Sequence, residues 1–320
     1  MEAFVSLVTN DSYALGAIAL GRSLRNTGTW KKLALLITNQ VSQDMRCRLE
    51  RQWDELVLVE QLDSEDSEHL ALLTRPELGV TFSKIHAWRL TQYSKCVFLD
   101  ADTIVLQNVD ELFDREELSA APDIGWPDCF NSGVFVFEPS LSTFRGLMDL
   151  ARQRGSFDGG DQGLLNVYWS DWPTKDIKYH LPFIYNVTPN ITYGYAPAYE
   201  RFGHNIKIIH FIGPNKPWQH HYVPEVDSVI LFPGTYASEH GAQDYIRRWW
   251  QLYIEAEQIG QSDFMEIADA KNRQVESVRA RRRSSRINHQ TNFEHGHIDF
   301  NGRDSFENIQ AHIEKMMNSN

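Results

Sequence analysis

The chain is poor in cysteine and has no long hydrophobic run, and both absences exclude classes of protein. Its three cysteines, at positions 47, 96 and 129 of 320 residues, are odd in number and widely spaced. This pattern fits neither a disulfide framework nor a zinc site and indicates reduced thiols in an intracellular protein. The longest apolar runs, such as 17–20, are far too short to span a bilayer. The first residues lack the basic and apolar regions of a signal peptide, so we expect a cytoplasmic protein with no membrane contact.

Positive charge and glycine-rich phosphate motifs are also scarce. Lys and Arg number 31 against 43 Asp and Glu, which gives a formal net charge of -12. An acidic chain does not suit nucleic-acid binding, although it can bind a diphosphate through a metal ion and a few local cations. The absence of a Gly-x-Gly-x-x-Gly motif argues against a dinucleotide cofactor. Two glycosylation sequons, at Asn186 and Asn190, are interpreted as chance matches because no secretory signal precedes them.

Hydrophobic residues make up 42% of the chain and recur in a pattern that alternates strands with helices. Short apolar runs predict strands at 4–8, 33–38, 56–59, 95–104, 133–137 and 206–211. Helical spacing of apolar residues predicts helices at 13–24, 45–53, 83–93, 142–154 and 245–254. The alternation predicts an α/β fold with a mostly parallel sheet and helices on both faces.

The composition changes after about residue 258, where polar and charged residues begin to dominate. We interpret residues 1–258 as the globular domain and 259–298, which include an arginine-rich run, as a flexible linker. Residues 299–320 form a distinct element, in which Asp304 can cap a helix and apolar residues recur at helical spacing. This short helix either folds back on the main domain or docks into the groove of a partner.

Two carboxylates one residue apart, Asp100 and Asp102, lie in the apolar strand predicted at 95–104. If the strand geometry persists, their side chains point the same way, and two hard oxygen ligands at the end of a buried strand can hold a divalent cation. The alternative is a solvated turn, where aspartate is common. His210 ends another apolar strand and is the candidate third ligand, although such a histidine also serves as a structural residue. Carboxylates with one imidazole suit Mn²⁺ or Mg²⁺ better than Zn²⁺.

Cationic residues near these strands are candidates for a phosphate site. Lys216 lies on a loop rich in proline and glycine just past His210, where it could balance a phosphate that the metal also binds. Lys84 and Arg75 are further candidates. The alternative for each of these side chains is simple solvation at the surface.

Two polar stretches are candidates for a sugar site. In residues 158–162 the glycines allow a ligand to approach the backbone, and Asp161 and Gln162 can bond sugar hydroxyls. A carboxylate there could also stabilise positive charge at an anomeric carbon. The alternative is a helix cap, which would use one aspartate of this stretch but not both. Asn131 and Ser132 precede a predicted strand, where they suit either a sugar contact or a turn.

Four motifs occur here in the order in which the retaining glycosyltransferases of family eight have them, and the chain resembles that family. They are Phe98-Leu99-Asp100-Ala101-Asp102-Thr103, Phe130-Asn131-Ser132-Gly133-Val134-Phe135, Gly159-Gly160-Asp161-Gln162-Gly163 and the run from His210 to Trp218. Further stretches, at 75–81, 90–98, 114–123, 125–129 and 181–186, are similar to the branch of the family that primes glycogen synthesis by glucosylating itself. The resemblance covers about residues 3–255.

This resemblance implies a GT-A-type, Rossmann-like fold, a homodimer, and transfer of glucose from UDP-glucose with retention. It implies that Asp100, Asp102 and His210 bind Mn²⁺, with Mg²⁺ possible in its place. It implies catalytic roles for Asp158, Asp161 and Lys84, with Asp161 nearest the anomeric carbon. The residues implied to bind the donor are Leu7, Thr9, Asn10, Tyr13, Arg75, Lys84, Asp100, Ala101, Asp102, Asn131, Ser132, Asp158, Asp161, Gln162, His210, Gly213 and Lys216.

The resemblance also implies acceptors and a partner. The first acceptor corresponds to Tyr193, and the next is the growing α-1,4-glucan primer. Gly194 stands where the family has serine between two tyrosines, and Tyr195 is the alternative acceptor. Residues 300–320 are similar to the segment that binds glycogen synthase. Two other functions remain as alternatives: a related transferase with a small polyol acceptor, and a non-enzymatic scaffold that recruits the synthase.

Overall fold

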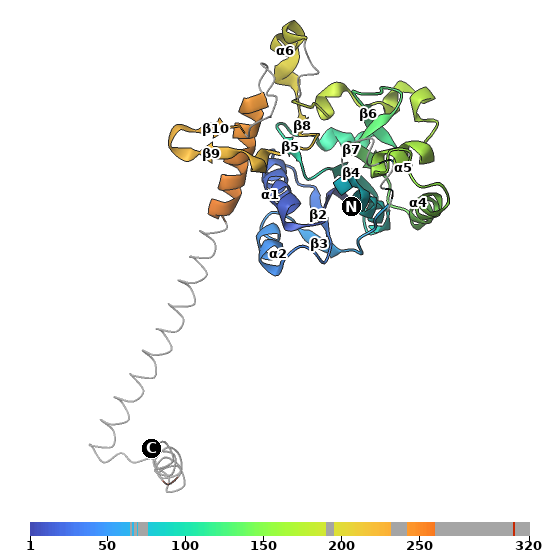
Figure 1. The fold of residues 1–320 in the computed structure, drawn as a ribbon, viewed down its shortest axis with the longest axis horizontal. Helices are drawn as coiled ribbons and strands as arrows, with labels where there is room; N and C mark the ends of the chain where they lie inside the picture. The colour runs from blue at the N-terminus through green and yellow to red at the C-terminus, as the bar shows by residue number, and fades with distance from the viewer. Residues whose placement is uncertain are drawn as a thin grey trace, which may run out of the picture. The chain divides into compact units, whose positions relative to one another are not determined.

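The computed structural model describes residues 1–64, 66, 69, 76–189, 195–231, 242–259 and 310 (Figure 1). The chain divides into two compact units, Met1–Gly260 and Gln261–Asn320. The predicted linker at 259–298 and the predicted helix at 299–320 lie outside the described residues, apart from 259 and 310. Both stay predictions, and the fold below is that of the first unit.

A six-stranded sheet forms the centre of this unit, in the order β3-β2-β1-β4-β7-β6. Its strands are β1 (Glu2–Val8), β2 (Lys32–Ile37), β3 (Glu55–Leu58), β4 (Lys95–Leu99), β6 (Ser119–Pro122) and β7 (Phe130–Phe137). The first four run parallel, whereas β7 is antiparallel to both β4 and β6. This confirms the predicted α/β fold with a mixed, mostly parallel sheet.

Five α-helices and a further helix at 242–259 accompany the sheet in the described residues. The five are α1 (Asp11–Asn26), α2 (Gln43–Leu49), α4 (Leu141–Arg154), α5 (Asp161–Tyr168) and α6 (Ala196–Phe202). Their ends follow local chemistry: the Asn10 side chain accepts from the Tyr13 amide at the start of α1, and Gly155, with φ of 66°, ends α4. None of the helices in the described ranges is both long and apolar enough to cross a membrane.

Short elements complete the unit. The 3₁₀ helices are η1 (Pro76–Arg89), η2 (Asp110–Asp114), η3 (Trp172–Thr174), η4 (Ile177–Tyr179), η5 (Phe183–Tyr185), η6 (Gly203–Asn205), η7 (Pro217–Gln219) and η8 (Pro224–Val226). The remaining strands are β5 (Thr103–Val105), β8 (Ile208–His210), β9 (His221–Val223) and β10 (Ser228–Ile230). Strands β5 and β8 pair with each other, as do β9 and β10.

Alternate residues of the central strands enter two separate apolar layers. Phe4 and Val8 pack with residues of α1 and α2, whereas Ala3 and Val5 pack with residues of η1, α4 and α5. Figure 1 shows α1 and α2 on one side of the sheet and α4 and α5 on the other. This period of two follows from strand geometry. On the second side Trp88 stacks on Phe135, with ring centroids 5.6 Å apart. Burying each such ring contributes about 1.5–3 kcal/mol, so both faces of the sheet are firmly covered.

Two contacts place the turn that carries the aspartates. Strand β5 pairs with β8 so that Thr103 lies opposite His210, and the Asp102 carbonyl accepts from the Phe211 amide at 2.9 Å. On the other side, a Cβ at Gly16 would lie 2.3 Å from the Ala101 carbonyl oxygen. Only glycine therefore allows α1 to approach this turn.

Some predicted elements differ from the structure. The predicted strand at 95–104 is interrupted, because the Asp100 carbonyl accepts from both the amide and the hydroxyl of Thr103 and so closes a turn. The predicted helix at 83–93 is the 3₁₀ helix η1, which ends at Arg89, and the helix predicted at 45–53 ends at Leu49. Strands β6, β9 and β10 and helix α6 are short elements that the apolar pattern did not predict.

Candidate active site

A cavity of about 650 Å³ opens at the carboxyl ends of the parallel strands. It is lined by every predicted site residue that the structure describes, namely Leu7, Thr9, Asn10, Tyr13, Lys84, Asp100, Ala101, Asp102, Asn131, Ser132, Asp158, Asp161, Gln162, His210, Gly213 and Lys216. Arg75 and Tyr193 lie outside the described residues. A concave site at this edge of the sheet is where α/β folds place their ligands.

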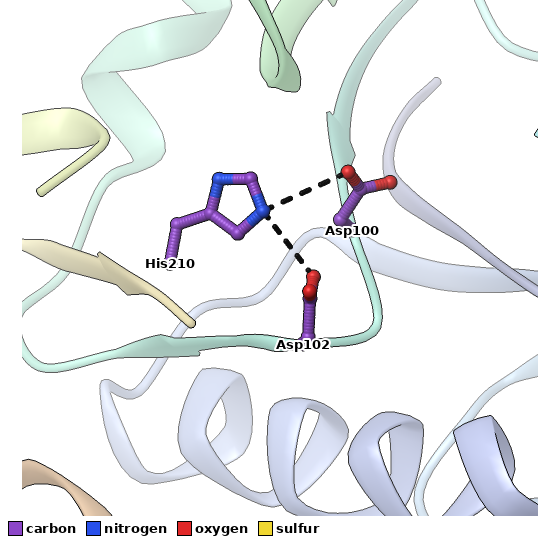
Figure 2. A group of neighbouring side chains, drawn as sticks. All are labelled: Asp100, Asp102 and His210. Carbon is purple, nitrogen blue, oxygen red and sulfur yellow. Dashed lines mark ion pairs between the residues drawn. The ribbon is translucent and has the colours of Figure 1, made fainter. Parts of the chain in front are cut away.

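The predicted metal ligands meet in this cavity. Figure 2 shows the imidazole of His210 pointing at both carboxylates, with Nε2 at 3.3 Å from Asp102 Oδ1 and 3.8 Å from Asp100 Oδ2. One ligand atom from each of the three residues lies within 4.8 Å of the others. The carboxylates converge through the turn rather than through strand alternation, which corrects the geometric reason that the sequence suggested. Two carboxylates and one imidazole fit a divalent cation that prefers oxygen.

Lys216 pairs with one of these carboxylates. Its Nζ contacts Asp102 Oδ2 and lies 3.0 Å from the Phe211 carbonyl oxygen. Burial alone would raise the pKa of Asp102, but Lys216 and His210 outweigh it and hold that pKa well below its usual range. Asp102 is therefore a carboxylate, the form that binds a cation.

Lys84 joins the metal cluster to the predicted sugar site. Its Nζ lies 2.9 Å from Asp100 Oδ1, 2.6 Å from Asp161 Oδ2 and 3.1 Å from the Ser132 carbonyl oxygen. Burial opposes the charge, yet the two carboxylates outweigh burial and raise the pKa of Lys84. A charged lysine thus stands between the buried carboxylate of Asp161 and the partly exposed carboxylate of Asp100, so loss of the lysine would leave two carboxylates without their shared cation.

The two aspartates of the 158–162 stretch have different partners. Asp158 Oδ1 accepts from the amides of Gly160 and Gly163, at 2.9 and 3.0 Å, and from the Ser156 hydroxyl at 2.7 Å. Asp158 therefore caps the start of α5 by bonding its backbone amides. This is the role that the helix-cap alternative gave to one of the two aspartates. Asp161 instead directs its carboxylate at Lys84. The Asp161 backbone amide donates to the Thr81 hydroxyl at 3.1 Å.

The structure adds two residues that sequence reasoning did not assign to the site. Asp123 Oδ2 accepts from the amides of Asn131 and Gln162, at 2.9 and 3.1 Å, and lines the cavity. Asn186 Oδ1 lies 2.9 Å from His210 Nδ1. Asn186 is only 5% exposed, so its sequon is no surface acceptor, in agreement with the chance match expected from the sequence. Asp123 directly follows strand β6, and a polar residue at the end of a strand is a typical site residue. The apolar pattern did not predict β6, so Asp123 was not identified from the sequence.

Comparison with known proteins agrees with this geometry. The family model described as Glycosyl transferase family 8 matches residues 4–221. Glycogenin-1 of Mus musculus is 45% identical over 334 aligned residues, which cover 98% of both chains. Glycogenin-1 of Homo sapiens is 54% identical over 252 residues, which cover 79% of this chain and 71% of that protein. The galactosyltransferase LgtC, solved with donor and acceptor sugar analogues, has a TM-score of 0.53 at 16% identity, covering 80% of this chain and 96% of its own.

The chain therefore belongs to glycosyltransferase family 8, and its sheet is of the GT-A type. Such glycosyltransferases use a divalent metal and a nucleotide sugar, and the cluster of Asp100, Asp102 and His210 fits that use. Within the family the chain belongs to the glycogenins, which are self-glucosylating glucosyltransferases. The predicted family, fold and enzymatic activity are thereby confirmed.

Proposed function

We propose that the chain transfers glucose from UDP-glucose with retention, first to Tyr193 and then to a growing α-1,4-glucan that primes glycogen synthase. One observation carries this proposal: a single cavity holds Asp100, Asp102 and His210 beside the ion pair of Lys84 with Asp161. A cation site for a diphosphate and a carboxylate for the sugar thus lie next to each other, as glucosyl transfer from a nucleotide donor requires.

We propose Mn²⁺ as the resident cation, with Mg²⁺ as the alternative. Asp100, Asp102 and His210 would hold it, and the bound cation would stabilise the negative charge that develops on the departing UDP. Lys216, which already faces Asp102, would add a second positive charge at the diphosphate. Gly213, with φ of 101°, has the backbone conformation in which a loop can turn its amide toward an anion.

The remaining lining residues divide by position. We assign uridine and ribose to Leu7, Thr9, Asn10 and Tyr13, which follow β1 or begin α1, with Arg75 as a further contact. We assign the donor glucose to Ala101, Asn131, Ser132, Asp158, Asp161 and Gln162. With these assignments the nucleotide would lie beside β1 and α1 and the glucose would lie near α5, so that the extended donor would cross the carboxyl edge of the sheet.

Asp161 is our candidate for the carboxylate nearest the anomeric carbon. The ion pair with Lys84 holds the Asp161 carboxylate from one side. The hydrogen bond from the Asp161 backbone amide to the Thr81 hydroxyl holds its backbone. A carboxylate there would stabilise the positive charge that develops at that carbon, whether the route to retention is a covalent intermediate or attack from the leaving-group face. Lys84 would keep this carboxylate in place during the reaction.

The acceptor assignment predicts the mass of the purified protein. With UDP-glucose and Mn²⁺ the intact chain is expected to gain steps of one hexose each, and Tyr193→Phe is expected to gain none. Tyr195→Phe should behave like wild type, since the neighbouring tyrosine remains. Hexose gain by Tyr193→Phe in the absence of added glucan, together with its loss in Tyr195→Phe, would move the acceptor to Tyr195. A wild-type chain that gains no hexose would refute self-glucosylation and leave the two alternatives, a transferase with a small polyol acceptor and a non-enzymatic scaffold.

Residues 300–320 are proposed to bind glycogen synthase, and the globular unit to form a homodimer in the cytoplasm. The family relationship supports both partners, and the three cysteines, which form no disulfide, support the location. Deleting 300–320 is expected to abolish capture of purified glycogen synthase in a pull-down, whereas hexose gain stays at the wild-type rate. Undiminished capture by the shortened chain would refute this assignment.

A further inference from the structure

A line of buried polar side chains runs from the metal ligand His210 to Asp123. His210 Nδ1 lies 2.9 Å from Asn186 Oδ1, and Asn186 Nδ2 lies 2.9 Å from Asn131 Oδ1. Asn131 Nδ2 then lies 2.9 Å from Asp123 Oδ2. His210, Asn186 and Asn131 are each at most 6% exposed. Because water has little access, each of these groups depends on its neighbour in the line for a hydrogen-bond partner.

Two groups that bond to Asn131, the Gly133 amide and the Asp123 carboxylate, determine which atom donates in every hydrogen bond of this line. A backbone amide can only donate, and the Gly133 amide lies 3.0 Å from Asn131 Oδ1, so this atom is the carbonyl oxygen. A carboxylate can only accept, so the other end of the Asn131 amide donates to Asp123. The group of Asn186 that faces Asn131 Oδ1 must therefore be its NH₂. The oxygen of Asn186 then faces His210 and accepts a proton from Nδ1.

This order of donors and acceptors determines which nitrogen of a neutral His210 ring carries the proton. With the proton on Nδ1, the lone pair is on Nε2, the atom that faces Asp100 and Asp102. In the other tautomer Nε2 would donate to Asp102 Oδ1, only 3.3 Å away, and its lone pair would be lost to a metal. Asp102 therefore favours the tautomer with the proton on Nε2, which cannot bind a cation. Asn186 favours the other tautomer, because its oxygen accepts the proton from Nδ1.

We propose that Asn186 is a positioning residue that holds His210 in its metal-binding tautomer and, through the same amide, fixes Asn131 at the donor-glucose site. The inference rests on the proposed function, because it assumes that the cation binds at His210. Hydrogen bonds behind a metal-bound histidine usually set its ring orientation and tautomer, and their loss costs roughly 10- to 100-fold in metal affinity. Asn186 would thus couple the metal site to the donor-glucose site by a second route, besides the contacts that Lys84 makes with Asp100 and Asp161.

Replacing Asn186 by alanine in the full chain tests the first half. We expect Mn²⁺ affinity, measured by titration calorimetry, to fall roughly 10- to 100-fold. In the metal-free protein, at a pH where the ¹⁵N shifts themselves show that the His210 ring is neutral, these shifts should move away from the values of the Nδ1–H tautomer. The resonance is identified by its absence in His210→Gln. Wild-type affinity and unchanged shifts in Asn186→Ala would overturn the inference.

Asn166→Ala is the matched control for a merely structural role. Asn166 lies on helix α5 beside strand β7, and among the described residues its side chain bonds to the backbone of Phe130 and Gln162. We expect this variant to lower the thermal stability and to leave the His210 shifts and Mn²⁺ affinity unchanged. Equal losses of Mn²⁺ affinity in both variants would show that general loosening explains the effect, and would overturn the inference.

Asn186→Asp separates the two proposed roles of Asn186, namely holding the His210 tautomer and fixing Asn131. It also provides a test if the alanine variant does not fold. Its carboxylate still accepts from His210 Nδ1 but can no longer donate to Asn131, so Mn²⁺ affinity should stay near wild type while KM for UDP-glucose rises about tenfold or more. Parallel loss of both would contradict the inference. If the wild-type chain itself bound no Mn²⁺, the proposed function would fail instead, so the two failures are distinguishable.

Discussion

Replacing Gly133 by alanine is expected to abolish Mn²⁺ binding and glucosyl transfer together. A Cβ at this position would lie 2.2 Å from Cε1 and 2.5 Å from Nδ1 of His210. Real side chains never approach so closely, so either the ring or strand β7 must shift. The strand lies between β4 and β6, and its residues are buried throughout, so the ring is the part that moves. A displacement of about 1 Å at a catalytic group can cost roughly 100-fold in rate.

The measurement pairs calorimetric Mn²⁺ titration with the gain of hexoses by mass spectrometry. Gly203→Ala is the control, because its added Cβ would meet nothing closer than 3.5 Å and its φ of -56° suits any residue. That variant should match wild type in both measurements. Wild-type Mn²⁺ affinity in Gly133→Ala would show that His210 is not held against this strand and would contradict the metal assignment.

Strand ends and their polar residues could be predicted because each signal is local. The apolar run at 95–99 and the carboxylates that follow it are contiguous, and so are the run ending at His210 and the loop that carries Lys216. Each run stops where its polar residues begin. Strand β4 brings Asp100 to the edge at which the parallel strands end, whereas β8 brings His210 to the same place by pairing antiparallel with β5. The composition of the cavity therefore follows from these runs together with the family motifs.

The contacts that orient the site could not be predicted, because they join residues far apart in the chain. Asn186 lies 24 residues from His210 and 55 from Asn131, on a segment without regular periodicity. The turn at Asp100 also depends on a distant partner, since its amide donates to the Gly133 carbonyl at 2.8 Å. A period of two or 3.6 predicts which face a residue takes, but not which polar atom from another element will meet it.

Lys84→Met is expected to destabilise the metal-free protein strongly and to prevent glucosyl transfer. The substitution removes the cation that pairs with Asp100 Oδ1 and Asp161 Oδ2, and it leaves both the partly exposed Asp100 and the buried Asp161 without a counter-charge. Breaking a buried pair in this way costs about 3–5 kcal/mol. Urea unfolding at neutral pH would measure the loss. Asp161 would also lose the partner that fixes it beside the proposed anomeric carbon, so hexose gain should disappear.

Lys178→Met provides the matched control. Lys178 Nζ lies 2.9 Å from Glu116 Oε1, the same distance as between Lys84 and Asp100, but both side chains of this pair are more than half exposed, whereas Lys84 is buried. An exposed pair contributes little, since water solvates both ions after the partner is lost. We therefore expect its unfolding curve to overlay that of wild type. Equal effects of the two substitutions would contradict the role given to burial.

Two further measurements identify the cause of the Lys84 effect as repulsion between carboxylates. Adding Asp161→Asn to Lys84→Met should recover part of the lost stability, because one of the two unpaired charges is then absent. Mn²⁺ should stabilise Lys84→Met more than it stabilises wild type, because the cation supplies at Asp100 the charge that the lysine no longer provides. If instead the double variant were less stable than Lys84→Met, the Asp161 carboxylate would stabilise the fold even without its lysine, and repulsion between carboxylates would be excluded as the cause. The sign of this difference in stability therefore decides whether Lys84 stabilises the fold by neutralising Asp100 and Asp161.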